Sequence, residues 1–202
     1  MKLPKPNEFE LAPAGTQVAT CVQFVDLGSH ENVYQGQSKG MRREVRIAWE
    51  LPEESMRDGR PFLISKRYTW SMGEKSSLRK HLESWRGRKF DENDFGNFDI
   101  RNILGKPCLL SIKHDERNGN TYAHIDSVSP LMKNMTPPAQ INPNLYFSLD
   151  EFSQTTFDGL SEKTREYIAL SPEYRAIASG KPAQSAAPAK SGEADLDDEV
   201  PF

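Results

Sequence analysis

Within residues 41–51, every second residue from Val45 to Leu51 is hydrophobic, which is the pattern of a β-strand with one buried face. The hydrophobic positions are Val45, Ile47, Trp49 and Leu51. Residues 15–28 and 60–70 are also rich in β-forming residues, and a turn containing Asp58-Gly59 separates the last two segments. The sequence therefore predicts three consecutive strands that pair as a meander.

A helical pattern follows the third strand. Within residues 74–86, Leu78, Leu82 and Trp85 recur at the spacing of one face of an α-helix. Gly87 can adopt the left-handed conformation that often ends a helix. We expect one helix here, with its apolar stripe facing the core.

Asn118-Gly119 is the strongest turn signal in the chain, because this pair favours the tight turn of a two-residue β-hairpin. It predicts paired strands over residues 107–117 and 120–128. The register pairs Ile112 with Ile125 on the core side, and Lys113 with His124 and Asp115 with Tyr122 on the outer side. A slip by one residue would bury charged side chains, so the pattern predicts one register.

The predicted order is strand, strand, strand, helix, strand, strand. This order is typical of the OB-fold, a five-stranded, partly open barrel that presents strands 2 and 3 and two loops to oligonucleotides or oligosaccharides. We therefore predict a mainly β protein with an OB-fold-like five-stranded barrel, one helix between strands 3 and 4, short C-terminal helices and a disordered acidic tail. The predicted divisions are an extended N-terminal arm over 1–14, the barrel over 15–130, a loop with short helices over 131–180, and a disordered linker with an acidic tip over 181–202.

Residues 131–180 hold helix-start signals and many aromatic residues. Ser161 and Ser171-Pro172 are suited to begin two short helices. The aromatic residues include Phe147, Phe152, Phe157 and Tyr167. We expect them to pack against the barrel or against a second subunit, and the sequence does not distinguish these two arrangements.

The charges are unevenly distributed, although 26 Lys and Arg against 29 Asp and Glu give a net charge of only −3. Residues 39–89 hold 14 basic and 7 acidic residues, whereas residues 181–202 hold 2 basic and 5 acidic ones. A basic centre and an acidic end indicate partners of opposite charge at the two places. No segment approaches the roughly 18 apolar residues of a membrane span, and no secretory signal is recognisable. With only Cys21 and Cys108, we expect a reduced, cytoplasmic protein.

The common catalytic and phosphate-binding motifs are missing from the sequence. His114 and His124 fall on opposite faces of the predicted hairpin, so we expect no joint metal site. We predict a protein that is not an enzyme, with no catalytic residue, no metal and no cofactor.

Basic and aromatic residues lie close together in the basic centre, as in KRYTW over residues 66–70. Single strands are bound by basic grooves that follow the backbone and by rings that stack on bases. The candidate residues for binding single-stranded DNA are Arg42, Arg43, Arg46, Lys66, Arg67, Tyr68, Trp70, Lys113 and Tyr122. Tyr68 and Trp70 share strand parity with Ile64, so the pattern leaves open whether they lie in the core or on the surface.

The chain ends in DLDDEVPF, an acidic run followed by Val, Pro and Phe. Pro stiffens the backbone, and the Phe ring can fill an apolar pocket while the carboxylates meet basic residues of a partner. The candidate partner-binding residues are Asp195, Asp197, Asp198, Glu199, Pro201 and Phe202.

This tip resembles the acidic tip of bacterial and phage single-stranded DNA-binding proteins, with Glu199 where aspartate is more usual. Residues 13–131, including RREVRIAWEL, ISKRYTW and LRKHLESWRGRKF, also resemble phage-encoded proteins of this class. The resemblance implies an OB-fold core that coats single strands in replication, recombination or repair. It also implies a tip that recruits polymerases, helicases, nucleases or recombination mediators. Residues 131–180 depart from the usual bacterial form, so tetramer assembly is not carried over.

Together these observations predict a sequence-tolerant single-stranded DNA-binding protein of a phage or prophage, acting in the bacterial cytoplasm. Two alternatives remain open: an adaptor whose OB barrel binds protein, and a divalent-metal nuclease that uses scattered carboxylates. The sequence does not decide between DNA and RNA, nor whether the protein is a homo-oligomer.

Overall fold

The computed structural model describes residues 10–180, apart from the side chain of Tyr34. The strands are β1 (Gly15–Tyr34), β2 (Gln37–Ser55), β3 (Pro61–Thr69), β4 (Pro107–Arg117), β5 (Asn120–Ser129) and β6 (Leu145–Phe147). The helices are α1 (Ser77–Arg86), α2 (Asp94–Asn97), α3 (Gln154–Asp158), α4 (Glu162–Ala169) and α5 (Pro172–Ala178), with a 3-10 helix over Ile100–Ile103. The protein is mainly β with a few short helices, as predicted.

The strands form one open sheet in the order β3-β2-β1-β4-β5, with neighbours antiparallel, and the short β6 pairs with β1 in parallel. Within the described residues no hydrogen-bonded ladder joins β3 to β5, so the sheet is not a closed barrel. The two edge strands nevertheless approach each other. Lys66 Nζ on β3 donates a hydrogen bond to the backbone oxygen of Ile125 on β5, at 3.1 Å. The sheet is therefore curled until its edges nearly meet.

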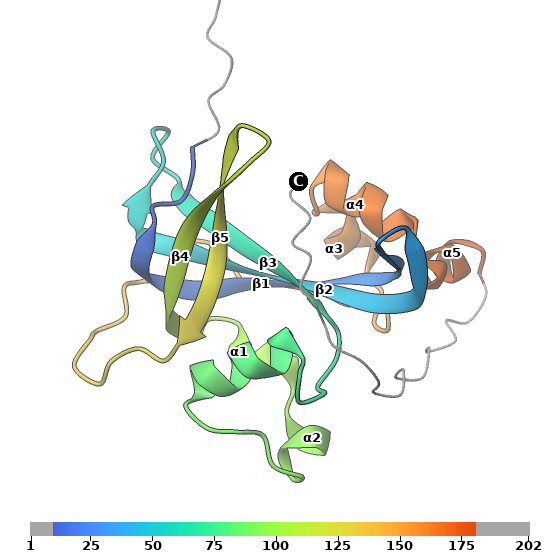
Figure 1. The fold of residues 1–202 in the computed structure, drawn as a ribbon, viewed down its shortest axis with the longest axis horizontal. Helices are drawn as coiled ribbons and strands as arrows, with labels where there is room; N and C mark the ends of the chain where they lie inside the picture. Colours follow the sequence, from blue (N-terminus) through green and yellow to red (C-terminus); the bar gives the residue numbers. More distant parts are fainter. Residues whose placement is uncertain (1–9, 181–202) are drawn as a thin grey trace, which may run out of the picture.

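The first two strands are longer than the sequence pattern predicts, at 20 and 19 residues. Beyond Gly28 they continue as a two-stranded ribbon toward a turn at Gln35 and Gly36, both with positive φ. Figure 1 shows this ribbon reaching across the molecule to the side of α3, α4 and α5. Residues 29–40 contain few hydrophobic residues, so the local pattern gives no signal for strands there.

The predicted hairpin register is confirmed. Ile112 pairs with Ile125, Lys113 with His124, and Asp115 with Tyr122. Asn118 and Gly119 have φ values of 50° and 77°, as a type I′ turn requires. A bulge between Ser111 and Ile112 shifts the register only beyond the predicted pairs.

Two hydrophobic clusters lie on opposite faces of β1, because successive side chains of a strand point to opposite sides. Phe24 belongs to the larger cluster, in which the curled sheet and α1 pack together. Val25 and Leu27 belong to the second cluster, which they form with Phe147, Leu149 and residues of α3 and α4. The segment after β5 therefore packs against the chain's own β1.

Serine side chains cap α1, α3 and α5, whereas Ser161 precedes α4 without a side-chain capping hydrogen bond. Ser76 Oγ accepts a hydrogen bond from the backbone N–H of Arg79, so α1 begins at Ser77 rather than at the predicted residue 74. Gly87 ends α1 in the left-handed conformation, as predicted. Ser171 caps α5 in the same way, and Pro172 is its first residue. In Figure 1, α1 lies on one side of the β1–β2 ribbon, and α4 rises on the other side together with the β4–β5 hairpin.

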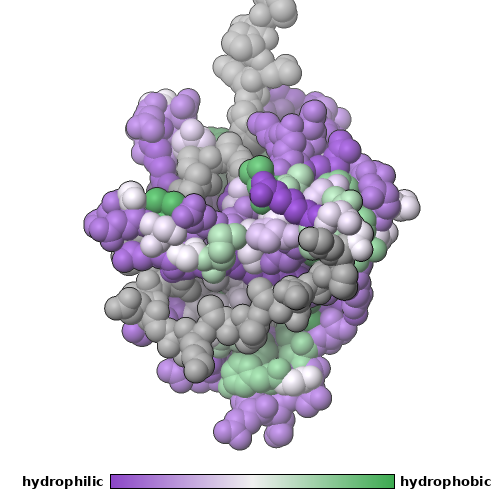
Figure 2. All heavy atoms as spheres, turned by 90° about the vertical axis from the view of Figure 1, so that its right-hand side faces the viewer, coloured by the Kyte–Doolittle hydropathy of each residue, from purple (hydrophilic) through white to green (hydrophobic). Residues whose placement is uncertain are grey.

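Hydrophilic residues cover most of the face at the end of the ribbon, and hydrophobic ones form separate patches (Figure 2). Half-exposed hydrophobic side chains on this ribbon include Val33 and Met41. None of the helices in residues 10–180 has both the length and the apolar character needed to cross a membrane.

Candidate nucleic-acid interface

The candidate cations on β2 and β3 do not share one accessible surface. Arg43 forms ion pairs with Asp26, at 2.5 Å, and with Asp150, at 2.9 Å. Asp26 also accepts a hydrogen bond from the backbone N–H of Leu149, at 3.0 Å. Burial lowers the pKa of Arg43, but the hydrogen bonds to the two carboxylates outweigh burial and raise it overall. Arg43 therefore ties β2 to the segment that follows β6.

Arg46 and Arg67 lie on the outer face of β2 and β3, beneath α4. Arg46 Nη1 donates a hydrogen bond to Thr164 Oγ1 at 2.8 Å. The pKa of Arg46 is lowered, mainly by burial and also by the positive charge of the nearby Arg67. Arg67 Nη1 donates to Glu44 Oε2 at 3.1 Å and to Tyr167 Oη at 2.8 Å. Its guanidinium carbon also lies 4.4 Å from the centre of the Tyr167 ring. These two arginines stabilise the docking of α4.

Tyr68 lies in the core, with 2% of its surface exposed. Its hydroxyl lies 2.9 Å from His81 Nδ1 on α1. The strand parity that Tyr68 shares with Ile64 decides its position, because both side chains point into the larger cluster. The structure therefore does not offer the Tyr68 ring to a stacked base.

Trp70, by contrast, is 42% exposed, directly after the end of β3. Its ring packs edge-to-face on Phe24, with 5.7 Å between the ring centres. Its backbone N–H donates to the backbone oxygen of Arg43 at 2.7 Å, which holds the end of β3 against β2. The strand continues its pairing to this point, but the ring remains accessible.

Three of the four remaining candidates, Lys66, Lys113 and Tyr122, lie on β3 and on the β4–β5 hairpin, whose strand β5 approaches β3. We call this surface the β3–β5 seam, and it consists of Lys66, Lys113, Tyr122, His124 and Asp126. Lys113 Nζ lies 3.0 Å from Asp126 Oδ1, and both side chains are largely exposed. The hydrogen bond from Lys113 lowers the pKa of Asp126, and the charges of Lys113, His124 and Lys66 add to this effect. One carboxylate therefore lies among three basic groups.

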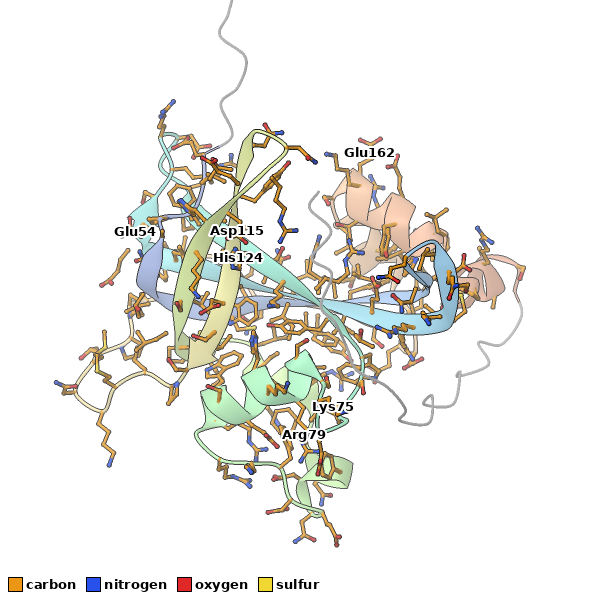
Figure 3. All side chains as sticks on the ribbon, in the orientation of Figure 1. Glu54, Lys75, Arg79, Asp115, His124 and Glu162 are labelled. Carbon is orange, nitrogen blue, oxygen red and sulfur yellow. The ribbon has the colours of Figure 1, made fainter. Side chains whose placement is uncertain are left out.

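Tyr122 is half-buried and lies opposite Asp115 in the hairpin. Figure 3 shows Asp115 and His124 close together on this hairpin, and His124 Nδ1 lies 3.2 Å from Asp115 Oδ2. His124 is absent from the residues predicted to bind DNA, although the hairpin register places it opposite Lys113. The register was thus the signal that could have added His124 to the candidate residues.

Arg42 is apart from both groups. It is half-buried on the β1–β2 ribbon, where it pairs with His30 in the ladder. The predicted partner-binding residues at the tip all lie outside the described residues. They are Asp195, Asp197, Asp198, Glu199, Pro201 and Phe202.

Residues 10–180 contain no group of three or more His, Cys, Asp or Glu side chains placed to hold a metal ion. The β3–β5 seam is a surface of cationic, carboxylate and aromatic groups. The structure defines a mainly β protein with an open, curled sheet and a mixed-charge seam. Comparison with models of protein families and with curated proteins found no match to this chain.

Proposed function

We propose that the protein binds single-stranded DNA with little sequence preference, through the β3–β5 seam and the neighbouring strand β3. The observation that carries this proposal is that Lys66 of β3 reaches the backbone oxygen of Ile125 on β5 and Lys113 pairs with the adjacent Asp126. By the hairpin register, Tyr122 lies on the same face of the β4–β5 hairpin as Lys113. Cations of this kind contact phosphates, and an accessible ring stacks on bases of any identity. Trp70 offers a second accessible ring at the end of β3.

The strand order supports an OB-type assignment for this sheet. A meander of three strands is followed by α1 and a closing hairpin, and the two edge strands lie close to each other. OB-folds are partly open barrels that bind oligonucleotides on strands 2 and 3 and on neighbouring loops. In this protein α4 covers part of that face, so we place the bound strand on the uncovered part beside the hairpin.

The proposal has two further parts. The protein acts by binding rather than by catalysis, in the cytoplasm of a bacterial host. The acidic tip over residues 193–202 recruits replication or recombination proteins, because a Phe ring and several carboxylates together suit a basic, apolar pocket.

Fluorescence anisotropy with labelled oligo-dT, the matched duplex and the matched RNA tests the function directly. We expect oligo-dT to bind more tightly than the duplex, and its affinity to fall between about 50 mM and about 200 mM salt because binding releases counterions. The RNA arm decides the preference between DNA and RNA. Equal affinity for duplex and single strand would contradict the proposal, because stacking requires unpaired bases.

A further inference from the structure

A cavity of about 360 Å³ lies between β1, the segment that leads into β6, and α3. The described residues that line it carry no charge. Most of them present amide or hydroxyl groups, namely Gln23, Asn142, Asn144, Tyr146 and Thr156. The cavity is therefore suited to a neutral polar molecule rather than to a phosphate or a metal ion.

Several of these groups have unused hydrogen-bonding capacity. In the described part of the chain, the Gln23 amide and the Tyr146 hydroxyl make no hydrogen bond. Asn144 Oδ1 accepts from Gln140, which leaves the Asn144 NH₂ group available. Asn142 donates through its NH₂ group to Glu50, at 2.7 Å, which leaves its amide oxygen available. Donors and acceptors are thus present side by side.

The wall that carries Asn142 is held in place by a buried carboxylate. Glu50 on β2 is fully buried, and it accepts hydrogen bonds from the backbone N–H groups of Ile141 and Asn142, at 2.7 and 2.8 Å. Such charge-assisted bonds are stronger than neutral ones and restrict the loop. The hydrogen-bonding groups of this wall are therefore preorganised.

The Tyr146 ring is also fixed. It stacks on Phe24 with 5.6 Å between the ring centres, and the guanidinium carbon of Arg101 lies 4.4 Å from its centre. The hydroxyl of Tyr146 is consequently the part that can serve a ligand by hydrogen bonding. Leu145 adds an apolar side chain to the lining.

We propose that this cavity receives one unpaired nucleobase, read by the amides of Gln23 and Asn144. A base is planar and neutral, and it presents donors and acceptors next to each other, to which Gln and Asn amides are complementary. Adenine is the base for which these amides form paired hydrogen bonds most readily. The inference rests on the proposed function and extends it, since the base would belong to a part of the bound single strand that lies beyond the β3–β5 seam, at the central strand β1.

The test uses short strands that are abasic at every position except one, which carries adenine. A fully abasic strand of the same length measures backbone binding alone. We expect the single adenine to tighten binding by about fivefold or more. Gln23→Leu should reduce this gain to less than about twofold, since it removes the amide but keeps the side-chain size.

Gln17→Leu is the matched control, because Gln17 is another half-buried glutamine of β1 and does not line the cavity. It should retain the full gain. Asn144→Ala changes an exposed residue and provides a second variant if Gln23→Leu fails to fold. It should also reduce the gain.

The two hypotheses fail in different ways. If Gln23→Leu and Asn144→Ala both keep the full gain in affinity from the single adenine, and oligo-dT still binds, the base pocket alone would be overturned. A wild-type protein that does not bind oligo-dT would overturn the proposed function and the base pocket together. A gain lost equally in Gln17→Leu would also contradict the pocket, because the loss would not depend on the cavity.

Discussion

The arginines covered by the segment from β6 to α4, namely Arg43, Arg46 and Arg67, and the lysines of the β3–β5 seam are basic side chains on one curled sheet, but their surroundings differ. Arg43 is 17% exposed and binds two carboxylates, whereas Lys113 is 59% exposed and meets one. The segment from β6 to α4 covers the first group and leaves the second accessible. A cation next to an aromatic residue in the sequence can therefore stabilise the fold or bind a ligand, depending on what covers it.

The largest expected effect comes from breaking the covered group. Arg43→Met leaves Asp26, whose side chain is 4% exposed, without its cationic partner. Removal of one member of a buried ion pair typically costs about 3–5 kcal/mol of unfolding free energy. We expect about 3 kcal/mol here, measured by urea denaturation.

Lys39→Met is the control for this substitution, because Lys39 is an exposed cation on the same strand. Its effect should stay within about 0.5 kcal/mol. An Arg43→Met protein with normal stability but weakened DNA binding would show that Arg43 belongs to the interface rather than to the fold.

The next effect concerns the ring of the seam. Tyr122→Ala should weaken binding of oligo-dT by about 1–3 kcal/mol, since it removes one stacking platform. Anisotropy titration at fixed salt measures the change. Phe95→Ala removes a ring that is 49% exposed on α2, and it should leave the affinity unchanged. Equal losses in both variants would mean that the seam has no special role.

A smaller effect is expected from a single seam cation. Lys113→Met should reduce the steepness of the salt dependence by about 0.7 on a double-logarithmic plot, the value for one phosphate contact with a single strand. Lys75→Met is the control, because Lys75 is an exposed residue on the α1 side of the molecule (Figure 3). A slope that changes only in the Lys75 variant would place the strand on the opposite side.

The smallest expected effect is on the pH dependence of the free energy of unfolding, through Glu173 on α5. Burial raises the pKa of Glu173, but hydrogen bonds from the Ser29 hydroxyl and backbone N–H outweigh it, so the pKa lies below its usual value of 4.5. The resulting stability is fully present above pH 4.5 and is lost as the pH falls through the lower pKa of the folded state.

Glu173→Gln should therefore flatten the fall in unfolding free energy between about pH 6 and about pH 3, because glutamine does not titrate. Urea denaturation across this range measures the slope for both proteins. An equally steep slope in the variant would show that other carboxylates account for the acid sensitivity.

Two further features separate local from long-range prediction. The hairpin register followed from Asn118-Gly119 and the alternation around it, and the structure has the same pairs. The length of the β1–β2 ribbon did not follow, because residues 29–40 have little alternation. Part of the ribbon is held by distant residues, since Glu173 accepts hydrogen bonds from Ser29 and Tyr167 stacks on His30. For Tyr68 the sequence holds two conflicting indications. Its strand parity indicated a buried position, whereas its place beside Arg67 and Trp70 indicated a binding role, and the structure has it buried.

The sequence by itself determined where the main strands lie, the apolar stripe of α1, the hairpin register and the helix that begins after Ser171. These features depend on contacts between residues that are near each other along the chain. The tertiary structure decided that the sheet stays open and that Arg46 binds Thr164, 118 residues away. It also decided which cations remain accessible, because coverage depends on how distant segments pack, and no local pattern carries that information.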